Sequence, residues 1–481
     1  MPICDYDLGI IGGGAAGLTV AAGAAQLGVK VLLIEKENSL GGDCLHYGCV
    51  PSKTLIRTAR VRHLMGKAQD FGLPSVDLPP VDYSKVADRI SSVVSEIQKH
   101  DSVERFNSLG VSVKFGSPSF VEKHSVLLEG KSVSARSWVI ATGSSPAAPP
   151  IPGLKDVPCL TNMDLFSLRE LPTSLLVLGG GPIAIEMAQA FQRLGCAVTV
   201  IQRSNHILSK EDADMAQYVM DAMMQDGVKF ILGAKVEQVR KGSSGIEVIL
   251  EDTFEGIGPR KVINGQKLLV ALGRKANTSG LELDEIGINH NSNGIDVDSR
   301  MRTSVKNIYA AGDVTGKHRF THAAGYEGGI IVANAVMHLP RKANYKWLPW
   351  CTYSDPELAS VGLNEVRAKA LGIKYSIVVE EFSGNDRALA EGEGCGRIKL
   401  LLDTKGKPLG VQVAAVHAGE LLGEWVAAVN GSVGLATLAG AIHPYPTLME
   451  INKRVAGKLL GEKIFSDKVR KILRMLFSYR G

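Results

Sequence analysis

The sequence predicts an α/β fold in which two doubly wound domains precede an α+β domain. A pattern of apolar strand, glycine-rich turn, alanine-rich helix and second apolar strand occurs at 7–34 and again at 175–203. Uninterrupted apolar strands around a helix are typical of a buried parallel βαβ unit. After about residue 348 the pattern changes, and strand-like segments at 374–382, 396–403 and 408–416 are followed by helices. This change indicates an α+β domain.

The length supports this organisation. A chain of 481 residues is too long for one hydrophobic core, and at roughly 150 residues per domain it should hold about three domains. A proline-rich stretch at 147–153 separates the two repeats, and the character of the sequence changes again at 340–349. We therefore expect domain boundaries in these two stretches.

The composition is that of an ordinary globular protein, with 45% hydrophobic and 21% charged residues. Lysine and arginine number 54 against 49 aspartates and glutamates, and the net charge of +5 is too small at this length to indicate nucleic-acid binding. The first residues run directly into an apolar strand without a signal-peptide pattern, and no apolar run is long enough to span a membrane. These features predict a cytoplasmic protein.

The first repeat carries a glycine-rich turn between its strand and its helix. Gly12, Gly14 and Gly17 form the spacing G-x-G-x-x-G. In this arrangement the first glycine makes a tight turn, the second lets the backbone approach a pyrophosphate, and the third lets helix and strand pack closely. Glu35 ends the second strand, where a carboxylate meets a ribose hydroxyl. Because strand, turn, helix and acid are all present, we interpret the segment as a Rossmann-like dinucleotide site rather than as an ordinary tight turn.

The second repeat has a related turn but a different strand end. Gly179, Gly181 and Ala184 occupy the three turn positions. Gln202 stands where the first repeat has its acid, and Arg203 follows it. A carboxylate at this place favours NADH, whereas a nearby arginine accommodates the 2′-phosphate of NADPH. The sequence therefore favours NADPH, and the alternative is an NADH site beside a solvated surface arginine.

Two of the seven cysteines lie close together. Cys44 and Cys49 are separated by four residues, and Pro51 follows at a position that suits the first turn of a helix. Cys49 would then lie at the positive end of that helix, which favours its thiolate. Lys53 follows one helical turn later, on the same face. In a reducing compartment such a pair is expected to be chemically active rather than structural.

A zinc site is the alternative for this segment, because His46 lies between the two cysteines. A structural zinc ion needs four ligands, and the sequence offers no second pair of cysteines or histidines to complete the set. We therefore predict no metal site.

With these motifs the chain resembles the pyridine nucleotide-disulfide oxidoreductase family, which includes dihydrolipoamide dehydrogenase, glutathione reductase and mercuric reductase. The resemblance covers essentially the whole chain, and the number and order of its motifs make it specific. The matching segments are GGDCLHYGCVPSKT at 41–54, IATGSSP at 140–146, GGGPIAIE at 179–186, VALGRKAN at 270–277, NIYAAGDVTG at 307–316 and TYSDPELASVG at 352–362.

The resemblance implies a homodimer in which FAD lies between its own domain, the nicotinamide domain and the C-terminal domain of the partner. The implied fold is two Rossmann-like dinucleotide-binding domains plus a C-terminal α+β dimerisation domain. The predicted boundaries are 1–150 for the first part of the FAD-binding domain, 151–276 for the NAD(P)-binding domain, 277–346 for the segment that returns to the FAD-binding domain, and 347–481 for the dimerisation domain.

The resemblance also implies a role for each motif residue. Cys49 is implied to be the thiol next to the flavin, and Cys44 the thiol that exchanges with the acceptor. Lys53 is implied to pair with Glu186 near the flavin, and Asp313 to hold the ribityl chain of FAD. Electrons would then pass from NAD(P)H through the flavin to a Cys44–Cys49 disulfide and on to an acceptor. The other implied cofactor-binding residues are Thr142, Gly143 and Gly273.

The chain departs from the family at one expected catalytic position. Dithiol-handling members resemble one another in a His-Pro-Thr-x-x-Glu segment, whose histidine carries protons to and from substrate thiols. Here 443–450 reads HPYPTLME, so that Tyr445 stands at the histidine position and Glu450 is retained. His443 lies two residues early, and residues two apart in an extended segment share a side. We interpret His443 as a turn histidine with satisfied hydrogen bonds, and the alternative is that it replaces the missing acid/base group.

A tyrosine at this position resembles mercuric reductase, in which thiol acid/base work is not needed. The sequence shows no vicinal cysteine pair at 470–481 and no metal-binding domain before Asp5, so efficient Hg(II) reduction is not expected. The favoured hypothesis is an NAD(P)H-dependent disulfide reductase of the mercuric-reductase-like branch, which acts on a small-molecule or protein-bound acceptor. The alternatives are a dihydrolipoamide dehydrogenase with an altered acid/base group and a flavoprotein subunit whose chief role is docking.

The segment 462–477 has the periodicity of an amphipathic helix. The favoured interpretation is a terminal helix packed on its own domain, with a solvated basic face. The alternative is contact with a membrane surface or with an acidic partner. The apolar residues at helical spacing are Phe465, Val469, Ile472, Leu473 and Leu476, and the basic residues among them are Lys468, Arg470, Lys471 and Arg474.

Overall fold

The computed structural model describes residues 4–243, 245–251 and 261–478. The chain forms two compact units, each built from several segments. Within the described ranges, no helix is long and apolar enough to cross a bilayer. The first unit comprises Met1–Gly179, Arg193–Cys196 and Val236–Asn344, and the second comprises Gly180–Gln192, Ala197–Lys235 and Tyr345–Gly481.

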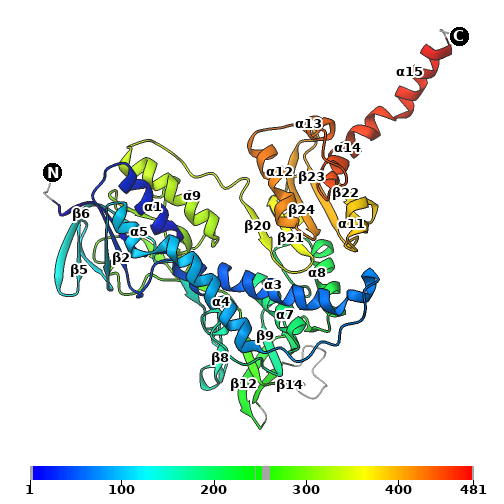
Figure 1. Cartoon of the computed structure of the whole chain (residues 1–481). Coiled ribbons are helices and arrows are strands. Elements are labelled where there is room, and N and C mark those ends of the chain that lie inside the picture. Colours follow the sequence, from blue (N-terminus) through cyan, green and yellow to red (C-terminus); the bar gives the residue numbers. More distant parts are fainter. Residues whose placement is uncertain (1–3, 244, 252–260, 479–481) are drawn as a thin grey trace. The chain divides into compact units, whose positions relative to one another are not determined.

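A seven-stranded sheet forms the centre of the first unit (Figure 1). Its strand order is β3-β2-β1-β6-β5-β4, and β19 also pairs with β6. β1, β2, β3, β6 and β19 are parallel, and β5 and β4 continue the sheet as antiparallel strands. The bounds are Tyr6–Ile11 for β1, Val31–Glu35 for β2, Val111–Phe115 for β3, Ser119–Glu122 for β4, Ser125–Leu128 for β5, Lys131–Ile140 for β6 and Ile308–Ala310 for β19.

Helices α1 (Ala15–Gln26) and α9 (Thr321–Ile331) lie side by side in this unit, as Figure 1 shows. A Cβ atom at Gly328 would lie 3.0 Å from the Cβ atom of Thr19, so the helices approach closely where α9 has no side chain. The other helices of the unit are α2 (Gly42–His46), α3 (Cys49–Gly66), α4 (Tyr83–Gln98), α5 (Val103–Ser108) and α6 (Asn162–Leu165).

The second predicted repeat forms β9 (Ser174–Leu178), α7 (Pro182–Leu194) and β10 (Ala197–Ile201), with residues from both units. In the first unit, β15 (Lys267–Val270) pairs in parallel with β9 and with β8 (Cys159–Leu160). In the second unit, β10 pairs in parallel with β11, which follows α8. The predicted α/β class is thus confirmed, whereas the finer domain boundaries stay predictions. The bounds are Ala213–Gln225 for α8, Lys229–Ile231 for β11, Ser144–Pro146 for β7, Val236–Gly242 for β12, Gly245–Leu250 for β13, Lys261–Gly265 for β14, Arg274–Ala276 for β16, His290–Asn291 for β17 and Gly294–Ile295 for β18.

The rest of the second unit is an antiparallel sheet covered by helices, which confirms the predicted α+β region. The strand order is β20-β21-β24-β23-β22. Trp425 and Phe382 are fully buried in its core. The strands are β20 (Pro349–Thr352), β21 (Glu357–Gly362), β22 (Ser376–Glu381), β23 (Arg397–Leu402) and β24 (Pro408–Ala415). The helices are α10 (Glu365–Ala370), α11 (Asp386–Ala390), α12 (Ala418–Asn430), α13 (Leu435–Gly440), α14 (Glu450–Ile464) and α15 (Asp467–Ser478).

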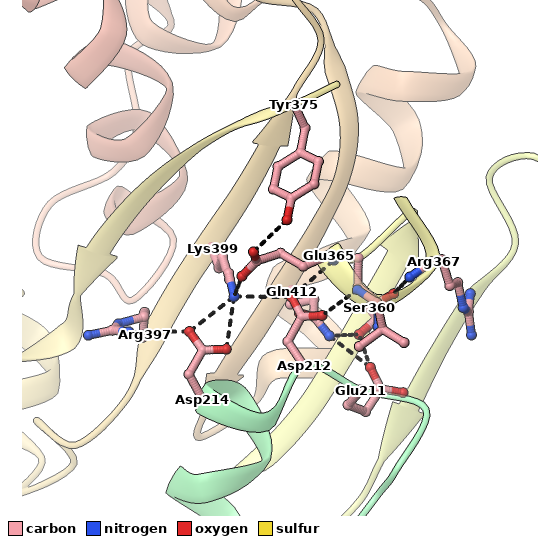
Figure 2. Close-up of polar contacts among 12 residues, drawn as sticks. Glu211, Asp212, Asp214, Ser360, Glu365, Arg367, Tyr375, Arg397, Lys399 and Gln412 are labelled. Carbon is pink, nitrogen blue, oxygen red and sulfur yellow. Dashed lines mark hydrogen bonds and ion pairs between the residues drawn. The ribbon is translucent and has the colours of Figure 1, made fainter. Parts of the chain in front are cut away.

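A buried lysine ties this sheet to the segment that begins α8. The Nζ atom of Lys399 lies 3.1 Å from Asp212 Oδ2, 2.8 Å from Asp214 Oδ1 and 2.5 Å from Glu365 Oε1 (Figure 2). The side chains of Lys399 and Asp212 are only 2% and 3% exposed. The three carboxylates lie close enough together to hold a metal ion, and the ammonium group lies among them as the cation. Burial opposes the charge of Lys399, but its three acidic partners raise its pKa above the ordinary lysine value.

Glu211 adds a second buried carboxylate beside this cluster (Figure 2). Its Oε1 atom accepts a hydrogen bond from Trp350 Nε1 at 2.5 Å. Its Oε2 atom accepts hydrogen bonds from Ser360 Oγ at 2.9 Å and from Gln412 Nε2 at 2.8 Å. Burial raises the pKa of Glu211 even though these three donors favour the charged form. The residues that lead into α8 are therefore held to the sheet by polar contacts in a buried environment.

The helical prediction for 462–477 is only partly right. α14 ends at Ile464 and α15 begins at Asp467, so the segment contains a helix boundary rather than one continuous helix. No residue of α15 is buried. The prediction that this segment packs on its own domain is therefore wrong, because helical periodicity reports an apolar face but not what covers it.

Candidate active site

The first glycine turn has the geometry that dinucleotide binding requires. Gly12 has φ +110°, and a Cβ atom there would lie 2.3 Å from the carbonyl oxygen of Ala141. A Cβ atom at Gly17 would lie 1.9 Å from the carbonyl oxygen of Gly12, so this contact between helix and strand excludes any side chain. At Gly14 the nearest atom is 3.9 Å away, so the backbone there is open to an approaching group. The two outer glycines are thus needed for packing, and the middle one leaves space for a ligand.

Glu35 lies at the carboxyl end of β2, and its side chain is buried. Its Oε2 atom accepts a hydrogen bond from the Gly13 N–H at 2.6 Å, and its Oε1 atom accepts one from the Glu37 N–H at 2.8 Å. The carboxylate is therefore fixed beside the glycine turn. This is the place where the sequence predicts contact with a ribose, and that contact stays a prediction.

Asp313 lies in the 3₁₀ turn Gly312–Thr315, after β19. Its Oδ2 atom accepts a hydrogen bond from Ser144 Oγ at 2.6 Å and lies 3.7 Å from Arg274 Nε. Burial raises the pKa of Asp313, and the Ser144 hydrogen bond and the Arg274 charge partly oppose this rise. A carboxylate with one free oxygen therefore lies beside β7, where it can accept a hydroxyl donor.

Arg274 is a site residue that the sequence prediction did not include. Its Nε atom donates to Ser144 Oγ at 2.7 Å, and its Nη2 atom lies 3.1 Å from Asp43 Oδ1. The guanidinium group therefore joins Asp313 to helix α2, which carries Cys44. The signal was present in the VALGRKAN segment, but only the fold shows that its arginine meets Asp43 and Ser144.

These residues fit FAD. The first turn of α1 carries no acidic side chain, so its N–H groups and positive dipole are available to a pyrophosphate. Gly143 and Gly273 have φ +70° and +127°, and an added Cβ atom at either would meet nothing within 4 Å. Thr142 Oγ1 donates to the Asn277 carbonyl at 2.7 Å, which ties the segments of these two glycines together. This unit thus offers open backbone at three glycines and fixed carboxylates at Glu35 and Asp313.

The cysteine pair lies where α2 meets α3. Cys49 is the first residue of α3, with Pro51 in the first turn, so the predicted helix and the predicted place of Cys49 at its N-terminus are confirmed. The two cysteines are thiols that hydrogen-bond each other. The pKa of Cys44 is raised, first by the hydrogen bond with Cys49 and then by burial. Cys44 therefore keeps its proton over a wider range of pH than an ordinary thiol.

Thr321, at the start of α9, is a second site residue that sequence reasoning missed. Its Oγ1 atom lies 3.5 Å from Cys49 Sγ. No motif in the sequence links Thr321 to the cysteines, because the contact depends on how α9 packs on α1. A hydroxyl donor at this distance can stabilise a thiolate on Cys49.

Lys53 and Glu186 belong to different compact units. Lys53 lies in α3 one turn after Cys49, as predicted. Glu186 lies in α7 and is buried, and its Oε1 atom accepts a hydrogen bond from the Tyr353 N–H at 2.9 Å. Their pairing near a flavin stays a prediction.

The second glycine turn has the same tight and open positions as the first. Gly179 has φ +115°, and a Cβ atom there would lie 2.6 Å from the Ala271 carbonyl oxygen, whereas nothing lies within 4 Å of one at Gly181. Gln202 lies directly after β10, and its side chain passes 3.0 Å from the Cβ position of Gly180. Arg203 is exposed, and its guanidinium group makes no ion pair within the described part of the chain. A cation is thus available at the end of β10.

Tyr445 is 69% exposed and donates a hydrogen bond from its hydroxyl to Asp386 Oδ2 at 2.9 Å. This hydrogen bond raises the pKa of the Tyr445 phenol above its ordinary value. Glu450 begins α14, and its Oε2 atom is buried but accepts no hydrogen bond from the residues that the structure describes. The phenol therefore keeps its proton and donates a hydrogen bond, and the Glu450 carboxylate has an acceptor that no described residue uses.

His443 is held in a buried network and does not face solvent. Its Nε2 atom lies 2.8 Å from Glu424 Oε1, its Nδ1 atom lies 3.2 Å from the Ala441 carbonyl oxygen, and its side chain is only 5% exposed. Asn452 Nδ2 donates to the other oxygen of Glu424 at 2.9 Å, and Trp425 Nε1 donates to Asn452 at 2.8 Å. The interpretation of His443 as a histidine with satisfied hydrogen bonds is confirmed. It is not an exposed substitute for the missing acid/base group.

The chain is similar to a known protein family and to individual proteins of known activity. The family model described as pyridine nucleotide-disulphide oxidoreductase matches residues 6–328, and the dimerisation-domain model of that family matches residues 348–456. Mercuric reductase from Bacillus cereus is 35% identical over 452 residues, which cover 93% of this chain and 70% of that protein. A dihydrolipoyl dehydrogenase from Bacillus subtilis (strain 168) is 34% identical over 454 residues, which cover 92% of this chain and 96% of that protein.

The chain is also similar to solved structures of flavoprotein disulfide reductases. The HOCl-induced flavoprotein disulfide reductase RclA from Escherichia coli has a TM-score of 0.83 and 28% sequence identity, over 94% of this chain and 99% of that chain. The Cu(II) complex of that protein is also similar, with a TM-score of 0.83 and 27% identity, over 93% of this chain and 99% of that chain.

Proposed function

Because the chain belongs to the pyridine nucleotide-disulphide oxidoreductase family, whose members are FAD-dependent oxidoreductases that use NAD(P)H, we propose that it is an NADPH-dependent disulfide reductase of the mercuric-reductase-like branch. It acts as a homodimer through the family's dimerisation domain. The observation that carries the proposal is the hydrogen-bonded pair of Cys44 and Cys49 at the N-terminus of α3.

Glu35, Asp313 and the open backbone at Gly14 would hold FAD. The bound cofactor would supply the two-electron chemistry between NAD(P)H and the disulfide. Reduction of the Cys44–Cys49 disulfide breaks the S–S bond and consumes two electrons. Because the pKa of Cys44 is raised, Cys44 keeps a proton and Cys49 is left as the thiolate.

The acceptor step begins when Cys44 loses this proton. Its sulfur then attacks one sulfur of a disulfide acceptor and releases one thiol. Cys49 next attacks Cys44, which re-forms the protein disulfide and releases the second thiol. The Tyr445 phenol is a poor base for this deprotonation, because its raised pKa keeps it protonated at neutral pH. We therefore expect disulfide acceptors whose thiols are acidic, because such thiols leave as thiolates.

Steady-state turnover with a panel of acceptors tests the proposal. The panel is lipoamide, glutathione disulfide, small quinones, Hg(II) and, because the Cu(II) complex of RclA is a structural neighbour, Cu(II), each with NADH and NADPH. Rapid lipoamide turnover would instead support the second candidate, a dihydrolipoamide dehydrogenase, which the equally similar Bacillus subtilis relative favours. Absence of turnover with every acceptor would favour a docking subunit.

The two cysteines are expected to differ in a spectroscopic test. After two-electron reduction, the wild type should show the long-wavelength absorption of a Cys49 thiolate against oxidised flavin. The Cys44→Ser variant should show this absorption without added reductant, because its Cys49 is already a thiol and can hold the charge. The Cys49→Ser variant should lose this absorption. Absorption spectra recorded during anaerobic titration measure the band, and identical spectra for the two variants would show that the assigned roles are wrong.

The end of β10 is expected to set the nucleotide preference. Arg203→Ala should lower kcat/KM for NADPH by about tenfold or more, because a charge-assisted contact with phosphate contributes about 1.5 to 3 kcal/mol. The value for NADH should change far less, since NADH has no 2′-phosphate. Lys374→Ala removes one exposed charge from the same unit and serves as the control. If the ratio of kcat/KM for NADPH to kcat/KM for NADH is the same in Arg203→Ala as in the wild type, the proposed nucleotide preference is wrong.

A further inference from the structure

α15 exposes a row of large apolar side chains. Ile472 is 49% exposed, Leu473 45%, Leu476 57% and Phe477 69%. Exposed apolar residues that gather on one surface mark an interaction site, whereas single ones do not. The helix also lies beyond residue 456, where the match to the dimerisation-domain model ends. The family fold therefore does not account for this surface.

The two faces of α15 differ in chemistry. Val469, Ile472, Leu473 and Leu476 recur at spacings of three and four residues, which places them on one side of the helix. The opposite side and the borders carry four cations, whereas Asp467 is the one acid among the twelve residues of the helix. The four cations are Lys468, Arg470, Lys471 and Arg474.

We propose that α15 lies on the surface of an anionic phospholipid bilayer, with its apolar side toward the acyl chains and its cations against the phosphates. With 12 residues at 1.5 Å each, the helix is about 18 Å long, which is too short to cross about 30 Å of hydrocarbon. It therefore lies parallel to the surface. The inference does not depend on which acceptor the enzyme reduces.

The charges favour a bilayer over a second copy of α15. Lys468 and Arg470 border the apolar side on its two edges, so a symmetric pair of these helices would bring cations together along both edges of the contact. Asp467, which pairs with Arg470 at 3.8 Å, is the one acid of α15 that could offset this repulsion. Lipid phosphates provide the missing anions, and a fluid interface accepts bulky side chains such as Phe477 without a shaped pocket.

Co-sedimentation of the full-length, FAD-loaded protein with vesicles tests the proposal. The vesicles are an equimolar mixture of phosphatidylcholine and phosphatidylglycerol, with phosphatidylcholine alone for comparison. The wild type should bind the anionic vesicles and should be released by added salt. The variant R470Q/R474Q should bind about 25-fold more weakly, at roughly fivefold for each cation removed. L473Q/L476Q should lose binding, because it removes apolar contacts with the acyl chains.

K85Q/K99Q is the matched control, since it removes two exposed cations from the α4 region and gives the same net charge as R470Q/R474Q. It should bind as the wild type does. Binding that falls equally in both charge variants would show attraction to overall charge and would overturn the proposal. A wild type that does not bind anionic vesicles would also overturn the proposal. The same holds if light scattering shows that L473Q/L476Q is a monomer where the wild type is a dimer, because α15 would then be a contact between subunits.

Discussion

Tyr445→His is expected to raise the rate of dihydrolipoamide oxidation at pH 7 by at least tenfold. General base catalysis typically contributes about 10² to 10⁴-fold, and the lower bound allows for imperfect placement of the new side chain. The wild-type phenol holds its proton at neutral pH because its hydrogen bond to Asp386 raises its pKa. The Glu450 Oε2 atom, which accepts no hydrogen bond from the described residues, can orient an introduced imidazole. Steady-state kinetics from pH 6 to 9 measure the gain, and wild-type activity should climb with pH as the substrate thiol ionises.

Two comparisons isolate the proton-transfer role. Tyr445→Phe removes the hydroxyl and should leave the low rate at pH 7 nearly unchanged, because the phenol does not act as the base. The half-reaction with NAD(P)H should hardly change in either variant, since no substrate thiol takes part in it. A wild type that already turns over at about 10 s⁻¹ or faster at pH 7, with no gain from Tyr445→His, would show that another group is the base.

Lys399→Met is expected to lower the free energy of unfolding by about 3 to 5 kcal/mol, because removal of the lysine leaves the buried carboxylate of Asp212 and the partly buried carboxylate of Glu365 without this counter-charge. Asp212 is 3% exposed and cannot regain hydration in the folded state. Urea unfolding followed by tryptophan fluorescence measures the loss, and Trp425 lies in the core of the same unit. Lys405→Met, which changes an exposed lysine of that unit, should stay within about 0.5 kcal/mol of the wild type.

The difference in the free energy of unfolding between wild type and Lys399→Met should depend on pH. In the wild type, burial acts to raise the pKa of Glu365, but hydrogen bonds from Lys399 and Tyr375 outweigh it and hold the pKa below its ordinary value. This stabilisation is complete above the ordinary glutamate pKa and is lost as the pH falls through the lowered one. In Lys399→Met the carboxylates repel one another, and acid relieves the repulsion. The difference should therefore be largest near neutral pH and should narrow on acidification.

Calcium provides a second test of the same cluster. Without the ammonium group, the oxygens of Asp212, Asp214 and Glu365 have the spacing of a cation site. Added Ca²⁺ should therefore stabilise Lys399→Met and leave the wild type unaffected. Equal stability of wild type and variant in the absence of Ca²⁺ would show that the ion pairs are energetically neutral.

Local signals in the sequence predicted the βαβ repeats, the start of the helix at Cys49 and the satisfied state of His443. The first two follow from residues that are near neighbours in the chain, whereas the hydrogen bond between His443 and Glu424 joins residues 19 apart. Arg274 and Thr321 were missed because their contacts with Asp43 and Cys49 join segments far apart in the sequence. The buried position of Lys399 could not be predicted either, because a single lysine in an apolar strand is expected to face solvent. Only the fold shows the three acidic residues around it.

The hydrogen-bond network of His443 bears on how the residue at position 445 can be replaced. The network runs through Glu424 and Asn452 to Trp425. It fixes the backbone two residues before position 445 to the core of α12 and α14, whereas the side chain at 445 points into solvent toward Asp386. The identity of that side chain can therefore change without disturbing the fold that presents it. We therefore expect that substitution of the single residue at position 445 changes which acceptors are used, at little cost in stability.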